Sequence, residues 1–310
     1  MPQETHEVVS KPKNPVEILK DKVGEAILTP QKYLPENSLP GIECQKDKKT
    51  GLPIFEGKAR IQIIEEMSDV IKQGGDVVIW LYDGDGLKEA NDKVSHEFGD
   101  AIITWGASFP LHELEKLDLK CRVIAMRPEG SPDDTLVFFE NPSADDGGKI
   151  IELNRKLNNP ATSIDLDIRD NEGKARTHSL SVTGGLAFYP KDEREVARRH
   201  RRLGIDNSPD FSTFTEGQIT DDIAKSKEND PEGYKFTIIE GLRQIADDRA
   251  HEAKGTKQLE QAMIFLETLR GLTLRDYDKA VRKRFSGTRT SEVTQELIDT
   301  TRIERFLPGM

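Results

Sequence analysis

The chain has 310 residues, of which 35% are hydrophobic and 33% charged, so it has enough apolar sequence for a core and is not wholly disordered. No apolar run approaches the ~18 to 20 residues that cross a bilayer, and the N-terminal segment lacks the apolar stretch of a signal peptide. The two cysteines, Cys44 and Cys121, exclude a disulfide framework and a cysteine zinc site. We therefore expect a cytoplasmic protein without a membrane partner.

The net charge of −11 is concentrated in the middle of the chain. Residues 56–190 carry 15 lysines and arginines against 25 aspartates and glutamates, a net charge of −10, while the flanking segments are almost neutral. An acidic surface repels phosphate backbones and attracts cations or basic partners. The charge therefore disfavours a nucleic-acid partner and favours a protein partner.

Composition divides the chain into three parts. Residues 1–40 are rich in proline and poor in apolar periodicity, which predicts a flexible N-terminal arm. Residues 41–190 alternate between strand and helix patterns, and residues 191–310 show only helical spacing. We expect the C-terminal helices to dock on the preceding domain, because apolar stripes such as the one through Leu259, Met263 and Leu266 must be covered.

Short apolar runs and 3.6-residue periodicity define the elements of the central part. The predicted helices, in chain order, are 58–72, 87–98, 110–117 and 148–157. The predicted strands are 76–82, 101–105, 121–126, 135–140, 163–168 and 178–189. Strands that alternate with helices favour parallel pairing, because a parallel crossover needs a covering element. The prediction is a three-layer, Rossmann-like α/β domain with a mainly parallel sheet, followed by an all-α region.

The segment Asp83-Gly84-Asp85-Gly86 stands between a buried strand and a helix. Ligands bind at the carboxyl ends of the strands in such sheets, and two carboxylates two residues apart can hold a hard cation such as Mg²⁺. Aspartate and glycine are also ordinary turn and helix N-cap residues. Both interpretations of Asp83 and Asp85 remain open.

A second acidic pair, Asp165 and Asp167, lies in the predicted strand 163–168. Strand alternation places both carboxylates on one face, which either marks a metal site or a solvated edge strand. The pairs Asp133-Asp134 and Asp145-Asp146 are interpreted as solvated loop acids.

The segment RRHRR contains Arg198, Arg199, Arg201 and Arg202 and ends close to Gly204. Cations at the C-terminal end of a helix complement its dipole. The same four arginines could instead bind an acidic partner.

The order of strand, DGDGL, helix, GGKIIELNRKL and SLSVTGG resembles a von Willebrand factor A domain. By this resemblance Asp83 matches the first cation ligand, and Asp85 and Leu87 occupy the positions of two serines. Lys149 replaces the threonine ligand and Gly184 the second aspartate. A second alignment places Asp47 at the first ligand. The resemblance implies an altered or lost cation site and a scaffold role.

Two functions follow from these patterns. The first is a protein-binding or scaffold module on the von Willebrand A-like domain. The alternative is a Mg²⁺-dependent enzyme that uses Asp83 and Asp85 on a phosphate-containing substrate. It would resemble either a Toprim nuclease, with Glu56 as a further carboxylate, or a nucleotide-sugar transferase, with Asp165 and Asp167.

Overall fold

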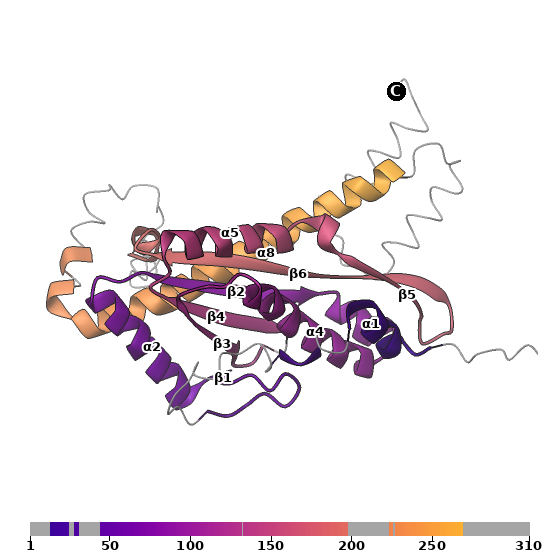
Figure 1. Cartoon of the computed structure of the whole chain (residues 1–310), viewed down its shortest axis with the longest axis horizontal. Coiled ribbons are helices and arrows are strands. Elements are labelled where there is room, and N and C mark those ends of the chain that lie inside the picture. Colours follow the sequence, from indigo (N-terminus) through magenta and orange to yellow (C-terminus); the bar gives the residue numbers. More distant parts are fainter. Residues whose placement is uncertain are drawn as a thin grey trace, which may run out of the picture.

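The computed structural model describes residues 13–24, 28–30, 44–131, 133–197, 223–225 and 227–268. Within these residues the chain forms one six-stranded sheet with helices on both faces (Figure 1). The strands are β1 (Ile54–Phe55), β2 (Val77–Asp85), β3 (Arg122–Pro128), β4 (Asp134–Glu140), β5 (Ile164–Arg169) and β6 (Ala175–Tyr189). The helices are α1 (Pro15–Val23), α2 (Gly57–Lys72), α3 (Leu87–Lys93), α4 (His96–Glu115), α5 (Ala144–Leu157) and α8 (Pro231–Thr268), with a short 3-10 helix at Pro160–Thr162.

The sheet is mostly antiparallel, with the strand order β1-β3-β4-β2-β6-β5. Only β1 and β3 pair in parallel, and the other four pairings are antiparallel. The prediction of a mainly parallel, Rossmann-like sheet is therefore wrong, although the α/β class is correct. The von Willebrand A resemblance is wrong for the same reason, because that fold has a mainly parallel sheet.

One misassigned segment and an overlooked hairpin account for the error. The segment 101–105, predicted as a strand, lies inside the 20-residue helix α4. Helices α3 and α4 together connect β2 to β3, and β4 inserts between these two strands as the return arm of a hairpin. The remaining strand predictions match β2, β3, β4, β5 and β6 within a few residues.

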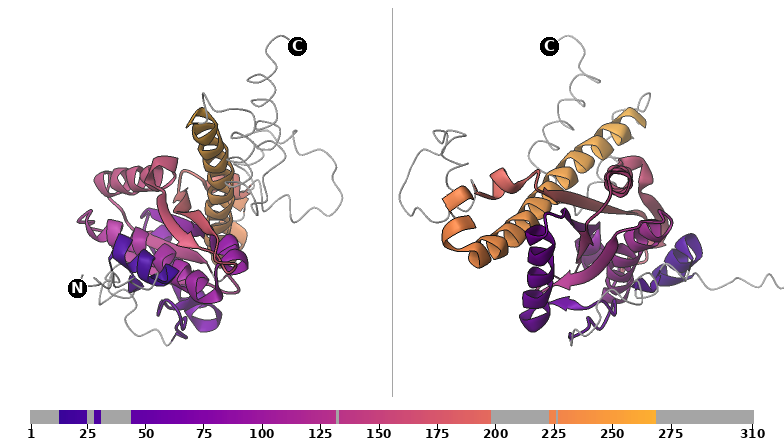
Figure 2. Two further views of the ribbon diagram at one scale, coloured as in Figure 1. Left: turned by 90° about the vertical axis from the view of Figure 1, so that its right-hand side faces the viewer. Right: turned by 60° about the vertical axis from the view of Figure 1, so that its left-hand side comes forward.

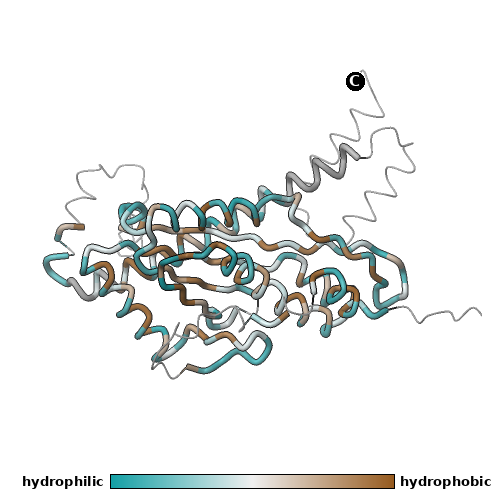
Figure 3. Tube along the Cα trace, in the orientation of Figure 1, coloured by the Kyte–Doolittle hydropathy of each residue, from teal (hydrophilic) through white to brown (hydrophobic). Residues whose placement is uncertain are grey.

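Strand β2 lies inside the sheet between β4 and β6, and it is buried on both faces. Its side chains alternate between two cores. Val78, Trp80 and Tyr82 face α1, α3, α4 and α5, whereas Val77, Ile79 and Leu81 face α2 and α8. The hydropathy colouring shows the apolar segments gathered along the central strands (Figure 3).

Helix α8 packs along β6 and β2, as we expected of the C-terminal helices. At 38 residues it is about 57 Å long, and its C-terminal end projects past the sheet (Figure 2). The apolar side chains that cover the sheet include Ile238, Leu242, Ile245 and Ala246. No helix among the described residues is long and apolar enough to cross a membrane. The domain boundaries at residues 40 and 190 stay a prediction.

Gly185 of β6 permits the contact between α8 and the sheet. A Cβ at this position would lie 2.0 Å from the carbonyl oxygen of Ala246 and 2.4 Å from the amide nitrogen of Ala250. We predict that Gly185→Val forces α8 away from β6 and lowers the free energy of unfolding by about 3 kcal/mol, measured by urea denaturation.

The matched control for this substitution is Gly148→Ala in α5, where no described atom lies within 4 Å of the added Cβ. This control should be as stable as the wild type or more stable by up to ~1 kcal/mol, because alanine favours the helix. Equal stability of Gly185→Val and wild type would contradict the close packing of α8.

Candidate metal centre

Asp83 and Asp85 lie in the last three residues of β2 and continue its alternation toward α8. The strand runs through Asp85, and Gly86, with a φ of 94°, starts helix α3. Neither carboxylate caps this helix, because Gly86 is its N-cap residue and no side-chain cap is present. The N-cap interpretation of the pair is therefore wrong.

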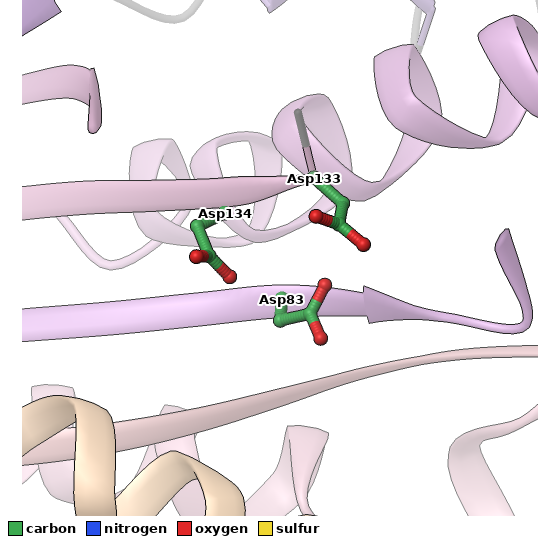
Figure 4. Close-up of side chains that lie close together, drawn as sticks. All are labelled: Asp83, Asp133 and Asp134. Carbon is green, nitrogen blue, oxygen red and sulfur yellow. The ribbon is translucent and has the colours of Figure 1, made fainter. Parts of the chain in front are cut away.

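Two further carboxylates join Asp83 from the neighbouring strand. The antiparallel register pairs Asp83 of β2 with Asp134, the first residue of β4, and Asp133 directly precedes it. One ligand atom from each of the three lies within 4.8 Å of the other two. Figure 4 shows the three carboxylates converging across the gap between the strands. The interpretation of Asp133 and Asp134 as solvated loop acids is wrong, since all three residues are half-buried.

Helix α8 brings two lysines to the same face of β2. The Nζ of Lys254 donates to Asp83 Oδ2 at 2.5 Å and lies 3.2 Å from Asp85 Oδ1. The Nζ of Lys257 is buried, donates to the carbonyl oxygens of Leu157 and Val182, and lies 3.8 Å from Asp85 Oδ2. The positive charges of these lysines partly balance the negative charges of the carboxylates.

Burial dominates the pKa values of the acidic cluster. It raises the pKa of Asp83 to about 6; Asp133 and Asp85 add to the rise, and the Lys254 ammonium opposes it. Burial also raises the pKa values of Asp133 and Asp134. Burial thus disfavours the ionised form of each carboxylate relative to water, and nearby positive charge favours it.

The pKa values of the two lysines move in opposite directions. Burial lowers the pKa of Lys257 to about 8, and its distant partner Asp85 only partly offsets this effect. Burial also disfavours the charge on Lys254, but the carboxylates of Asp83 and Asp85 outweigh it and raise the pKa of Lys254. Lys254 is therefore a cation at neutral pH.

The carboxylate of Asp85 contacts other residues of the same chain. Its Oδ2 accepts hydrogen bonds from Ser181 Oγ at 2.5 Å and Thr183 Oγ1 at 2.7 Å, and its Oδ1 pairs with Lys254. Asp83 Oδ1 and Asp85 Oδ1 are both buried without a hydrogen-bond partner among the described residues. Asp85 Oδ1 faces the Lys254 ammonium, whereas Asp83 offers one of the three carboxylate oxygens that lie within 4.8 Å of one another. The donor set that fits a hard divalent cation is therefore Asp83, Asp133 and Asp134, beside the Lys254 ammonium that Asp83 and Asp85 hold.

The other acidic pair lies away from this cluster. Asp165 and Asp167 are exposed on β5, where they accept hydrogen bonds from Ser179 and Thr177 of β6. The pair therefore lies on a solvated edge strand, which is one of the two interpretations of its alternating pattern.

The remaining candidate residues are dispersed. Glu56 follows β1, at the sheet edge three strands from β2, so it does not complete a Toprim-like set with Asp83. Lys149 pairs with Asp145 at 2.7 Å, and Asp47 binds the backbone and side chain of Thr50. Gly184 packs under Trp80. The positions implied by the von Willebrand resemblance thus do not form a site.

Arg198, Arg199, Arg201 and Arg202 lie outside the described residues. Their role in binding a protein partner stays a prediction.

Comparison with known proteins gives matches to solved structures. No protein-family model matches the sequence, and no curated protein matches it. Among solved structures the chain is similar to a sensory box/GGDEF family protein from Caulobacter crescentus, with 19% identity over 47% of this chain and 85% of that chain and a TM-score of 0.33.

Two other solved structures are also similar to this chain. The GGDEF domain of DgcB from Caulobacter crescentus, in complex with c-di-GMP, matches at 16% identity over 54% of this chain and 93% of that one, with a TM-score of 0.34. Diguanylate cyclase SiaD from Pseudomonas aeruginosa, in complex with its activator SiaC, matches at 18% identity over 60% and 58%, with a TM-score of 0.33. Because these TM-scores are low, we base the function on the site geometry alone.

The scaffold function expected from the sequence is wrong. It depended on the von Willebrand resemblance, which the antiparallel sheet overturns, and on an incomplete set of carboxylates. Asp133 and Asp134 supply the acids that the local sequence around Asp83 lacks.

Proposed function

We propose that this protein is an enzyme that uses a divalent metal ion, Mg²⁺ or Mn²⁺, on a phosphate-containing substrate. Asp83, Asp133 and Asp134 would hold the ion. The observation that carries the proposal is the convergence of these three carboxylates from adjacent strands. Carboxylate oxygens suit both metals, and Mg²⁺ is commonly bound by a few carboxylates together with substrate phosphates.

The residues around the cluster support this chemistry. When bound, the metal would neutralise charge on a phosphoryl group and polarise it. Asp83 is ionised above its pKa of about 6, so the cluster carries the negative charge that metal binding needs at neutral pH. Asp85, fixed by Ser181 and Thr183, positions the Lys254 ammonium against Asp83.

The first test is a turnover assay with the full chain and a panel of phosphate compounds: ATP, GTP and a phosphodiester. The products assayed are phosphate, pyrophosphate and dinucleotides. We predict turnover that needs Mg²⁺ or Mn²⁺ and stops on chelation. Asp134→Asn should lower the rate by about 100-fold or more, because it removes a proposed metal ligand.

The matched control is Asp165→Asn, which changes an aspartate at the start of another strand, outside the cluster. It should retain wild-type turnover. Equal activity of Asp134→Asn and wild type, or turnover that persists after chelation, would contradict the proposal.

A further inference from the structure

Asp83 lies between the Lys254 ammonium and the proposed metal position. Its Oδ2 accepts a hydrogen bond from the Lys254 ammonium at 2.5 Å. Its Oδ1 is buried without a hydrogen-bond partner among the described residues, and its carboxylate belongs to the cluster with Asp133 and Asp134. One carboxylate can therefore serve the ammonium and a metal ion at the same time.

Asp85 provides the second carboxylate that contacts the Lys254 ammonium. Its Oδ1 lies 3.2 Å from the Lys254 Nζ, so the ammonium is held between the carboxylates of Asp83 and Asp85. In sites with two metal ions, one carboxylate often bridges ions about 3.5 to 4 Å apart. In this protein Asp83 occupies the position of the bridging carboxylate, and the ammonium of Lys254 occupies the position of the second metal ion.

The charges of the residues agree with a single divalent ion. The cluster and its neighbours comprise four carboxylates, those of Asp83, Asp85, Asp133 and Asp134, and two lysines, Lys254 and Lys257. The opposite charges of Arg127 and Asp247, which also act on Asp134, cancel. Two negative charges remain when all six groups are charged, and one divalent ion balances them. A second divalent ion would leave a half-buried site with excess positive charge, which is unfavourable away from water.

We propose that the ammonium of Lys254 is a built-in second cation that limits this carboxylate site to one divalent metal ion. The inference rests on the proposed metal function and adds its stoichiometry. Because Lys254 belongs to α8, the position of that helix on the sheet sets how many ions the site accepts.

The test counts bound Mn²⁺ in the full-length protein, using the electron paramagnetic resonance signal of the free ion during a titration at pH 8. We expect one Mn²⁺ per wild-type chain and two per Lys254→Met chain, because the variant keeps the aliphatic stem and removes the charge. Lys254→Arg keeps a cation between Asp83 and Asp85 and should bind one. Circular dichroism verifies that each variant is folded, and Lys254→Gln replaces the methionine variant if that one is not.

The matched control is Lys149→Met, which removes a lysine paired with Asp145 outside the cluster and should bind one Mn²⁺. Two ions in the wild type, or one ion in the folded neutral variant, would overturn the role of Lys254 and leave the metal function intact. Absence of Mn²⁺ binding to the wild type and every variant would overturn the metal function and, with it, this inference.

Discussion

Replacing Asp83 by asparagine should lower Mn²⁺ affinity by about 100-fold or more and remove metal-dependent turnover. Asp83 is the only one of the three clustered aspartates on β2, and its buried Oδ1 lacks a hydrogen-bond partner among the described residues. The amide offers one oxygen without the negative charge. Titration calorimetry with Mn²⁺ measures the affinity, and circular dichroism shows whether the variant is folded.

Asp85→Asn is the matched control, because Asp85 lies two residues away on the same strand face. The structure uses its carboxylate for Ser181, Thr183 and Lys254. We expect a loss of affinity of about 10-fold, at the lower end of the range for a residue that orients metal ligands. A larger loss in Asp85→Asn than in Asp83→Asn would contradict the assignment of the ligands.

Metal ions should stabilise the protein at pH 8 and have little effect at pH 5. At a concentration of about 100 times its dissociation constant, a bound ion adds about 2.7 kcal/mol to the free energy of unfolding. For a domain of this size, that corresponds to a rise in melting temperature of roughly 5 to 10 °C. Burial raises the pKa of Asp83 to about 6, so at pH 5 a proton occupies the carboxylate that the metal needs.

The same pKa predicts the pH dependence of the metal-free protein. Between about pH 4 and pH 6, folded Asp83 holds a proton that the unfolded chain, with an ordinary pKa near ~3.9, has released. The contribution of this group to stability is therefore favourable below pH 4 and is lost as the pH rises through 6. In differential scanning calorimetry, Asp83→Asn should lack both this dependence and the metal-induced shift. A metal-induced shift of equal size at pH 5 and pH 8, or in Asp83→Asn, would contradict the account.

Most elements were predictable from local sequence, but the sheet topology was not. The run 101–105 is apolar and partly β-branched, which suits both a buried strand and a buried helix. Two signals favoured the wrong choice: the run is short, and Pro110 marks a break because it removes a helix hydrogen bond. In the structure α4 continues through Pro110, and Gly106 lets the helix approach Gly84 of β2. That approach is a tertiary contact, and the sequence does not reveal it.

Only the part of the metal site that lies on β2 was predictable from the sequence. Asp83 stood out because it follows a buried run, whereas Asp133 and Asp134 resembled ordinary turn residues. The short turn between the segments 121–126 and 135–140 was a usable signal for a hairpin, which would have made β4 antiparallel to β3. Nothing local indicates that β4 also pairs with β2 in the register that places Asp134 beside Asp83. The contribution of Lys254 depends on α8 packing across the sheet, at a separation of 171 residues from Asp83.

The most direct measurement is the anomalous diffraction of crystals grown with Mn²⁺ at pH 8. We predict one anomalous peak per chain, within coordination distance of carboxylate oxygens from Asp83, Asp133 and Asp134, with the Lys254 ammonium still between Asp83 and Asp85. A peak bound by other residues, or no peak at the cluster in crystals that contain ordered Asp83, Asp133 and Asp134, would contradict it.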